Sequence, residues 1–168
     1  MADPVIMDSY ESALKAGREL ERLGYRWLEE PLLDVNLNGL RKLREKLDIP
    51  ICGTEVIAGA HYTTAHCIAE GIVDIVRTDV SWRGGITAVM KTAHVAEAFG
   101  VQCELHTTIY HGLEQVQLHP SLAIPNCEFF ETLYRPNLHQ NYLHSVTPNG
   151  YARNRGVFIY QYNTFESH

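Results

Sequence analysis

Apolar residues along the chain follow two alternating patterns. Stretches with apolar positions three to four residues apart, the spacing of one face of a helix, are separated by short runs with the length of a buried strand. The helical spacing predicts helices near residues 9–23, 37–47, 62–70, 85–99 and 110–118. The apolar runs predict strands at residues 25–29, 49–55, 72–76, 101–106 and 127–131. Helices and strands that alternate in this way are typical of βαβ units, so we expect an α/β fold with a parallel sheet.

The pattern changes after Arg135. The following stretch is rich in Asn, Tyr and His and has no helical period, although residues 156–160 could form one more strand. We therefore expect an α/β domain over residues 1–135 and a C-terminal tail over residues 136–168.

Ionisable or ligating residues recur at the end of each expected strand. The series consists of Asp3, Glu29, Glu55, Asp79, His106 and Glu131. Its steps are 26, 26, 24, 27 and 25 residues, and each step has the length of one βα unit. In a (β/α)₈ barrel the strand ends share the rim that carries the active site. The spacing predicts that these six side chains lie on that rim.

The first three members of the series are carboxylates on neighbouring strands. Neighbouring strands lie only about 5 Å apart, so Asp3, Glu29 and Glu55 would repel one another without a cation between them. Ligation by oxygen alone favours Mg²⁺, although a single acid at a strand end is more often a solvated loop residue. Glu30 competes with Glu29, but adjacent residues of a strand face opposite sides. The spacing from Asp3 to Glu29 equals that from Glu29 to Glu55, 26 residues each. This regular spacing favours Glu29 as the ligand and Glu30 as a supporting partner.

The next two members form an acid–imidazole pair. A carboxylate such as Asp79 beside His106 would fix the tautomer of the ring and stabilise its charged form, as in a general base. His106 could instead be a buried structural histidine. Glu131, on the following strand, could donate a hydrogen bond or a proton to a developing oxyanion.

Composition and charge exclude several classes of partner. The 168 residues are 45% hydrophobic, enough for one sizeable core, and the net charge of −6 comes from interspersed acids and bases. No basic patch for nucleic acid, no polybasic segment for a membrane surface and no signal peptide are visible. The apolar runs are too short for a transmembrane helix, and the four widely spaced cysteines suit buried free thiols. We expect a cytoplasmic protein.

Several motifs resemble the mandelate racemase branch of the enolase superfamily. Trp27-Leu28-Glu29-Glu30-Pro31 resembles the fourth-strand motif of that family, and Gly53-Thr54-Glu55 resembles its fifth-strand Gly-x-Glu. Asp3, Asp79, His106 and Glu131 fall where the family has its third-strand ligand, its Asp–His dyad and its eighth-strand Glu. The resemblance covers about residues 1–135 and implies a partial TIM-type (β/α) barrel made of strands 3–8 of the C-terminal domain.

The resemblance also implies a reaction. Mg²⁺ would hold a small-molecule carboxylate, and His106 would take the proton from its α-carbon or assist a departing hydroxyl. Dehydration of a sugar acid is the commonest chemistry in this branch, and relatives commonly form homo-oligomers.

Two alternatives follow from where the sequence departs from the family. It has no counterpart of the capping domain, of the first two barrel strands or of their Lys-x-Lys motif. One alternative is therefore a catalytically inactive remnant that at most binds metal. The other is a racemase or epimerase of a 2-hydroxy acid, which needs bases on both faces of its substrate.

Overall fold

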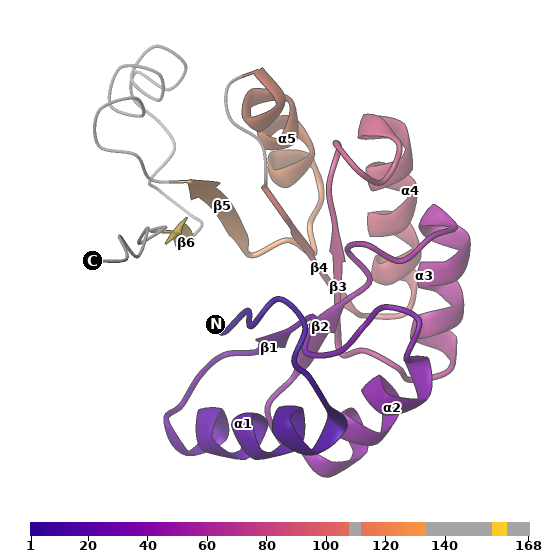
Figure 1. The fold of residues 1–168 in the computed structure, drawn as a ribbon. Helices are drawn as coiled ribbons and strands as arrows, with labels where there is room; N and C mark the ends of the chain where they lie inside the picture. The colour runs from indigo at the N-terminus through magenta and orange to yellow at the C-terminus, as the bar shows by residue number, and fades with distance from the viewer. Residues whose placement is uncertain (108–111, 134–155, 161–168) are drawn as a thin grey trace.

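One parallel sheet organises the molecule. The computed structural model describes residues 1–107, 112–133 and 156–160. The sheet has six strands in sequential order: β1 (Leu28–Glu29), β2 (Ile51–Gly53), β3 (Ile75–Thr78), β4 (Gln102–Leu105), β5 (Phe129–Leu133) and β6 (Gly156–Tyr160). All neighbouring pairs are parallel. In Figure 1 the strands form an arc rather than a closed barrel. The prediction of a partial (β/α) barrel is therefore confirmed.

In the described ranges the structure has five helices, and they cover the outer side of this arc (Figure 1). They are α1 (Tyr10–Arg22), α2 (Leu37–Lys46), α3 (Ala60–Ala69), α4 (Gly85–Ala98) and α5 (Gly112–Ala123). The first four match the predicted helices to within three residues at each end. The fifth continues five residues past the predicted end and contains Pro120. Residues 110 and 111 of the predicted helix lie outside the described part of the chain.

The chain ahead of β1 is tied to the sheet. Ala2 forms an isolated parallel bridge with Leu28. The Ala2 amide donates to the Trp27 carbonyl at 3.0 Å, and the Glu29 amide donates to the Ala2 carbonyl at 2.8 Å. These bonds hold Asp3 at the same end of the sheet as the end of β1.

The two faces of the sheet bury different side chains. The main hydrophobic core lies between the sheet and its helices and contains, among others, Leu28, Ile51 and Val76. A smaller cluster of Trp27, Cys52 and Ile75 packs with Phe129 on the other, concave face. Residues two apart on a strand share a face, so Glu29, Arg77 and Glu131 follow Trp27, Ile75 and Phe129 on that concave face. The concave face therefore carries an apolar layer with a charged layer beside it.

Four further expectations concern the rest of the chain. All four cysteines are buried and free, as predicted. Within the described ranges no helix is long and apolar enough to cross a membrane. Residues 156–160 form the additional strand, but residues 134–155 and 161–168 lie outside the description. The boundary of the predicted tail near Arg135 stays a prediction.

The core between the sheet and α2 gives a stability prediction. Leu43 is 0% exposed, whereas Leu23, just after α1, is 54% exposed. Leu43→Ala should lower the free energy of unfolding by about 2–5 kcal/mol, because it leaves a cavity in a packed interior. Urea unfolding of both variants measures this, with Leu23→Ala as the matched control. Equal losses for the two variants would contradict the described packing.

Candidate active site

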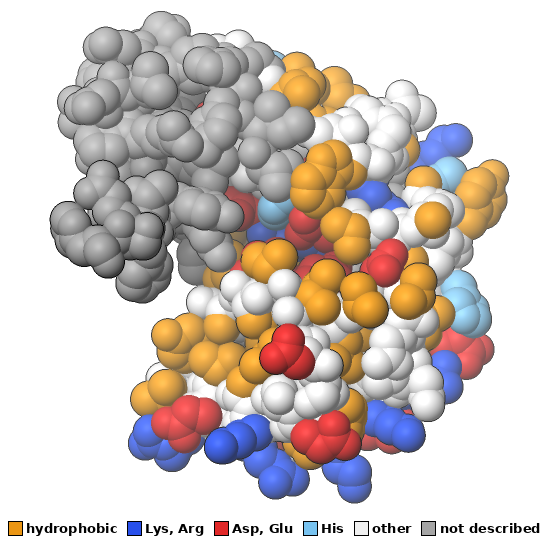
Figure 2. All heavy atoms as spheres, in the orientation of Figure 1, with side chains coloured by type: hydrophobic (Ala, Val, Ile, Leu, Met, Phe, Trp, Pro, Cys, Tyr) orange, Lys and Arg blue, Asp and Glu red, His pale blue; other side chains and the backbone are white. Residues whose placement is uncertain are grey.

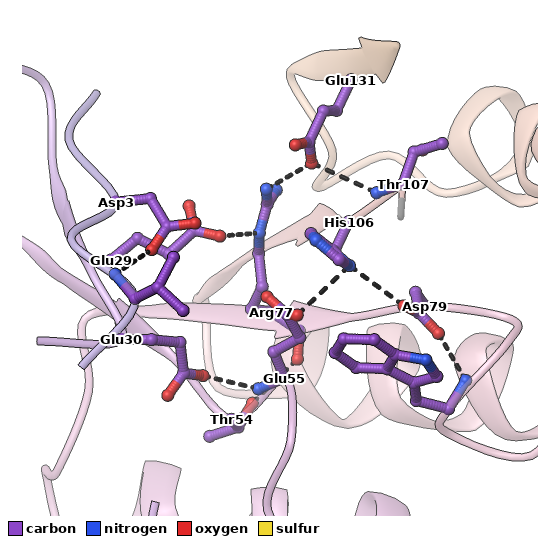
Figure 3. A network of polar contacts seen from close by, with 12 residues as sticks. Asp3, Glu29, Glu30, Thr54, Glu55, Arg77, Asp79, His106, Thr107 and Glu131 are labelled. Atoms are coloured by element: carbon purple, nitrogen blue, oxygen red, sulfur yellow. Dashed lines mark hydrogen bonds and ion pairs between the residues drawn. The ribbon is translucent and has the colours of Figure 1, made fainter. Parts of the chain in front are cut away.

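The six residues of the predicted series lie at the same end of the sheet. On the face shown in Figure 2, acidic, basic and histidine side chains come together near the centre, among hydrophobic ones. The close view in Figure 3 shows Asp3, Glu29, Glu55, Asp79, His106 and Glu131 side by side. All of them are buried except Asp3, which is half-buried. The prediction of a shared rim agrees with this arrangement.

Backbone strain accompanies the turn that carries Glu55. Thr54 lies between Gly53, the last residue of β2, and Glu55, and it has φ of 83°. A β-branched residue at positive φ costs about 1–3 kcal/mol, and such positions concentrate at functional sites. The Thr54 hydroxyl donates to the Arg77 carbonyl at 3.0 Å. This bond ties the strained turn to β3.

Asp79 and His106 form the expected pair. His106 Nδ1 lies 3.0 Å from Asp79 Oδ2 and 3.3 Å from Glu55 Oε1. Asp79 is itself held, because its Oδ1 accepts from the Trp82 amide at 2.6 Å. Burial of the ring opposes its charge, but the hydrogen bond to Asp79 and the charge of Glu55 outweigh burial and raise the pKa of His106. The pair can therefore hold a proton on the imidazole.

A buried arginine, Arg77, stands at the centre of the cluster. Its side chain is 3% exposed, and its Nε donates to Glu29 Oε1 at 2.6 Å. Its Nη2 forms an ion pair with Glu131. The other Glu29 oxygen accepts from Trp27 Nε1 at 2.9 Å. One guanidinium thus links carboxylates from β1 and β5 across the concave face.

The sequence analysis did not assign a role to Arg77. Arg77 is the one charged residue within the strand Ile75–Thr78, and strands of a parallel sheet are covered on both faces. It also stands two residues before Asp79, which places it on the same face. That position was the signal that could have identified it.

Glu30 supports Glu55, in agreement with its predicted secondary role. Its Oε1 accepts from the Glu55 amide at 2.8 Å. Burial raises the pKa of Glu30 to about 7 and that of Glu55 to about 8. Burial and the charge of Glu29 also raise the pKa of Asp3. Negative charge is therefore costly at these three carboxyl groups.

The donor chemistry of this cluster fits a hard divalent cation, because carboxylate oxygens are the ligands that Mg²⁺ prefers. A cation would also offset the costly negative charge. In the part of the chain that the structure describes, however, no three His, Cys, Asp or Glu side chains converge closely enough to hold a metal ion. Asp3 accepts from the Val5 amide, Glu29 is paired with Arg77, and Glu55 faces His106. The metal site stays a prediction that requires these side chains to turn toward one another.

Known proteins are similar to this chain in sequence and in fold. Arabinonate dehydratase from Saccharolobus solfataricus is 39% identical over 92 residues, which are 55% of this chain and 24% of that protein. The crystal structure of D-glucarate dehydratase from Agrobacterium tumefaciens complexed with magnesium is 42% identical, with a TM-score of 0.71. The match covers 78% of this chain and 33% of that one.

A second solved structure is L-talarate/galactarate dehydratase from Salmonella typhimurium LT2, liganded with Mg and L-lyxarohydroxamate. It is 28% identical with a TM-score of 0.64, and the match covers 74% of this chain and 31% of that one. The chain thus spans about a quarter to a third of the length of the curated relatives it matches. These relatives are named as sugar-acid dehydratases or as a member of a dehydratase family, and three of the similar solved structures are described with magnesium.

The family model described as Enolase C-terminal domain-like matches residues 1–158. This match covers nearly the whole chain, and it agrees with the parallel half-barrel and with the motifs at its strand ends. The chain therefore belongs to the enolase C-terminal domain-like family of the enolase superfamily.

Proposed function

We propose that this chain carries the metal-binding and proton-transfer residues of a Mg²⁺-dependent sugar-acid dehydratase. The observation that carries the proposal is the Asp79–His106 pair, 3.0 Å apart, beside carboxylates from three neighbouring strand ends. The names of the relatives support dehydration of a sugar acid as the reaction class. A cytoplasmic location and a homo-oligomer stay predictions.

Asp3, Glu29 and Glu55 are the proposed ligands of the cation. When bound, Mg²⁺ would neutralise the substrate carboxylate and stabilise the charge that develops when the α-proton leaves. Glu29 would have to release one oxygen from Arg77 or Trp27, and Glu55 would have to turn from His106. Glu30 would keep the turn at Glu55 in place through its hydrogen bond to the backbone.

His106 is the proposed base. Its Nδ1 faces Asp79, which leaves Nε2 to take the α-proton, and Asp79 would stabilise the imidazolium that forms. The electron pair of the broken C–H bond stays on the substrate and forms a double bond as the neighbouring C–O bond breaks. The departing hydroxyl takes a proton and leaves as water. The same imidazolium can supply that proton.

Glu131 is proposed to assist at the developing oxyanion. Acting as a donor would require a proton on Glu131 and an opening of its ion pair with Arg77. Its Oε2 also accepts from the Thr107 amide at 3.2 Å, which fixes the carboxyl group beside His106.

Dehydration is favoured over racemisation because it can proceed with one base that later acts as an acid. In the described ranges, His106 is the base that a carboxylate orients at this rim. An inactive remnant stays the alternative, and the metal-binding measurement below separates it from an active site.

Mg²⁺ should stabilise the protein through the three proposed ligands. At a concentration about a hundred times the dissociation constant, binding to the folded state alone adds about 2.7 kcal/mol. Asp3→Asn should remove most of that gain, whereas Asp48→Asn, which replaces an exposed acid, should retain it. Thermal unfolding with and without Mg²⁺ measures both. A melting temperature of the unmodified protein that does not respond to Mg²⁺ would favour the remnant.

Loss of His106 should separate proton transfer from metal binding. His106→Asn should slow exchange of the substrate α-proton with deuterated solvent at least about a hundredfold, the scale of general-base catalysis, with Mg²⁺ affinity nearly unchanged. NMR of D-glucarate or D-gluconate in D₂O follows the exchange, and His94→Asn on the exposed side of α4 serves as the control. Retained exchange in the variant would exclude His106 as the base.

Arg77 should be needed for stability as well as for the site. Arg77→Met leaves Glu29 and Glu131 buried without their cation, so it should lower the free energy of unfolding by about 3–5 kcal/mol. Arg22→Met removes an exposed pair with Glu19 and should cost little stability, because solvent screens the charges. Chemical denaturation compares the two. Losses of equal size would mean that Arg77 does not hold these carboxylates together.

A further inference from the structure

The side chain of Gln117 joins the two backbones that carry Asp79 and His106. Gln117 lies in α5 and is 1% exposed. Its Oε1 accepts from the Val80 amide at 3.0 Å, and its Nε2 donates to the His106 carbonyl at 3.0 Å. Val80 directly follows Asp79 in the chain. Both bonds therefore reach the backbone within one residue of the acid–imidazole pair.

These two bonds take the place of one bond of the sheet. Strands β3 and β4 are paired up to Thr78 and Leu105. The His106 amide continues the ladder, because it donates to the Thr78 carbonyl at 2.9 Å. In a regular parallel ladder the next bond would run from the Val80 amide to the His106 carbonyl. The carboxamide of Gln117 bridges these two groups instead.

The bridge sets the spacing of the two strand ends. It replaces one direct hydrogen bond by two bonds in series with a planar amide group between them. Asp79 and His106 leave the ladder at this point, and their side chains meet at 3.0 Å between Oδ2 and Nδ1. The distance between their backbones, and hence the direction from which the side chains meet, is fixed by one group of α5.

The peptide unit after His106 is held from both sides. Its carbonyl accepts from Gln117, and its N–H, which belongs to Thr107, donates to Glu131 Oε2 at 3.2 Å (Figure 3). Rotation of this peptide unit would leave buried polar groups unsatisfied, which is costly. The backbone beneath the imidazole is therefore preorganised by two side chains from elsewhere in the chain.

Glutamine suits this bridge because of its chemistry. The Val80 amide needs an acceptor and the His106 carbonyl needs a donor, and a carboxamide supplies both on one planar group. An ionised carboxylate has no donor, and a thioether is a weak acceptor without a donor. The two partners also determine which end of the amide is the oxygen.

We propose that Gln117 is a positioning residue for the Asp79–His106 pair. It holds the two strand ends at the separation at which His106 Nδ1 meets the Asp79 carboxylate, and it thereby keeps Nε2 aimed at the α-proton. The bridge follows from the hydrogen bonds themselves, whereas its effect on proton transfer rests on the proposed function.

Two variants of Gln117 and one control test the bridge. Gln117→Met keeps the approximate size of the side chain and removes the donor. Gln117→Glu keeps the shape and the acceptor but, when ionised, has no donor for the His106 carbonyl, and it serves if Gln117→Met does not fold. The control is Gln115→Met, which replaces a half-buried glutamine of the same helix.

NMR of the protein without Mg²⁺ or substrate measures the pair directly. The readout is the exchange with solvent of the proton on His106 Nδ1, divided by the exchange of the Val76 amide within β3, which corrects for a general loss of stability. Both Gln117 variants should raise this ratio at least about tenfold, the scale of a charge-assisted hydrogen bond, because the Nδ1 proton loses its close contact with Asp79. Gln115→Met should leave the ratio unchanged.

Kinetics with Mg²⁺ and D-gluconate test the effect on the reaction. Gln117→Met should lower the kcat of α-proton exchange about tenfold to a hundredfold, the scale of a small misplacement of a catalytic group. The KM should stay within about twofold, because the bonds of Gln117 go to backbone atoms of the pair rather than to the substrate. A purely structural role would lower stability without this separation of kcat from KM.

The outcomes separate the bridge from the reaction. An unchanged exchange ratio in both Gln117 variants overturns the positioning role. A raised ratio with an unchanged kcat overturns its part in the reaction. If the ratio rises in the variants while the unmodified protein exchanges no α-proton, the proposed function fails and the bridge stands.

Discussion

Buried negative charge on the concave face is the constraint on which the site depends. Glu29, Glu55 and Glu131 come from three strands and are all buried within a small volume. Two unit charges 4 Å apart interact with about 4 kcal/mol at an effective dielectric constant of 20. Arg77 balances Glu29 and Glu131, whereas His106 faces Glu55 and Asp79. Burial raises the pKa of Glu30 to about 7 and that of Glu55 to about 8, so these carboxyl groups carry a negative charge only at a cost that these cations do not fully offset. A divalent cation between the first three strand ends would supply what is lacking.

Most of the fold followed from spacing. Helical and strand periods alternate, a βα unit has a nearly fixed length, and a polar residue that recurs at that length must return to the same rim. These relations predicted that the six side chains of the series, from Asp3 to Glu131, lie together at one rim. Figure 3 shows them side by side. They could not show how the side chains pair, because pairing depends on rotamers and on neighbours distant in sequence. Arg77, which contacts residues 48 and 54 positions away, is such a case.

Expectations from local sequence were wrong at two places where contacts with residues distant in sequence determine the backbone conformation. Helix α5 continues through Pro120, although proline ordinarily interrupts a helix. The Ser121 hydroxyl bonds the Gln117 carbonyl, and the Gln117 side chain joins the Val80 amide and the His106 carbonyl. These bonds fasten the helix to the ends of β3 and β4. The strained Thr54 is similar, since its hydroxyl bonds the Arg77 carbonyl of β3 and the next amide bonds the Glu30 carboxylate.

Anomalous diffraction from crystals soaked in Mn²⁺, a cation with the same preference for oxygen ligands, would test the central claim most directly. The claim is that Asp3, Glu29 and Glu55 share one cation at the strand ends. It requires a single anomalous peak within about 2.3 Å of an oxygen from each carboxylate, with Arg77 withdrawn from at least one Glu29 oxygen. A peak elsewhere, or none while Glu29 and Arg77 stay paired, would contradict it.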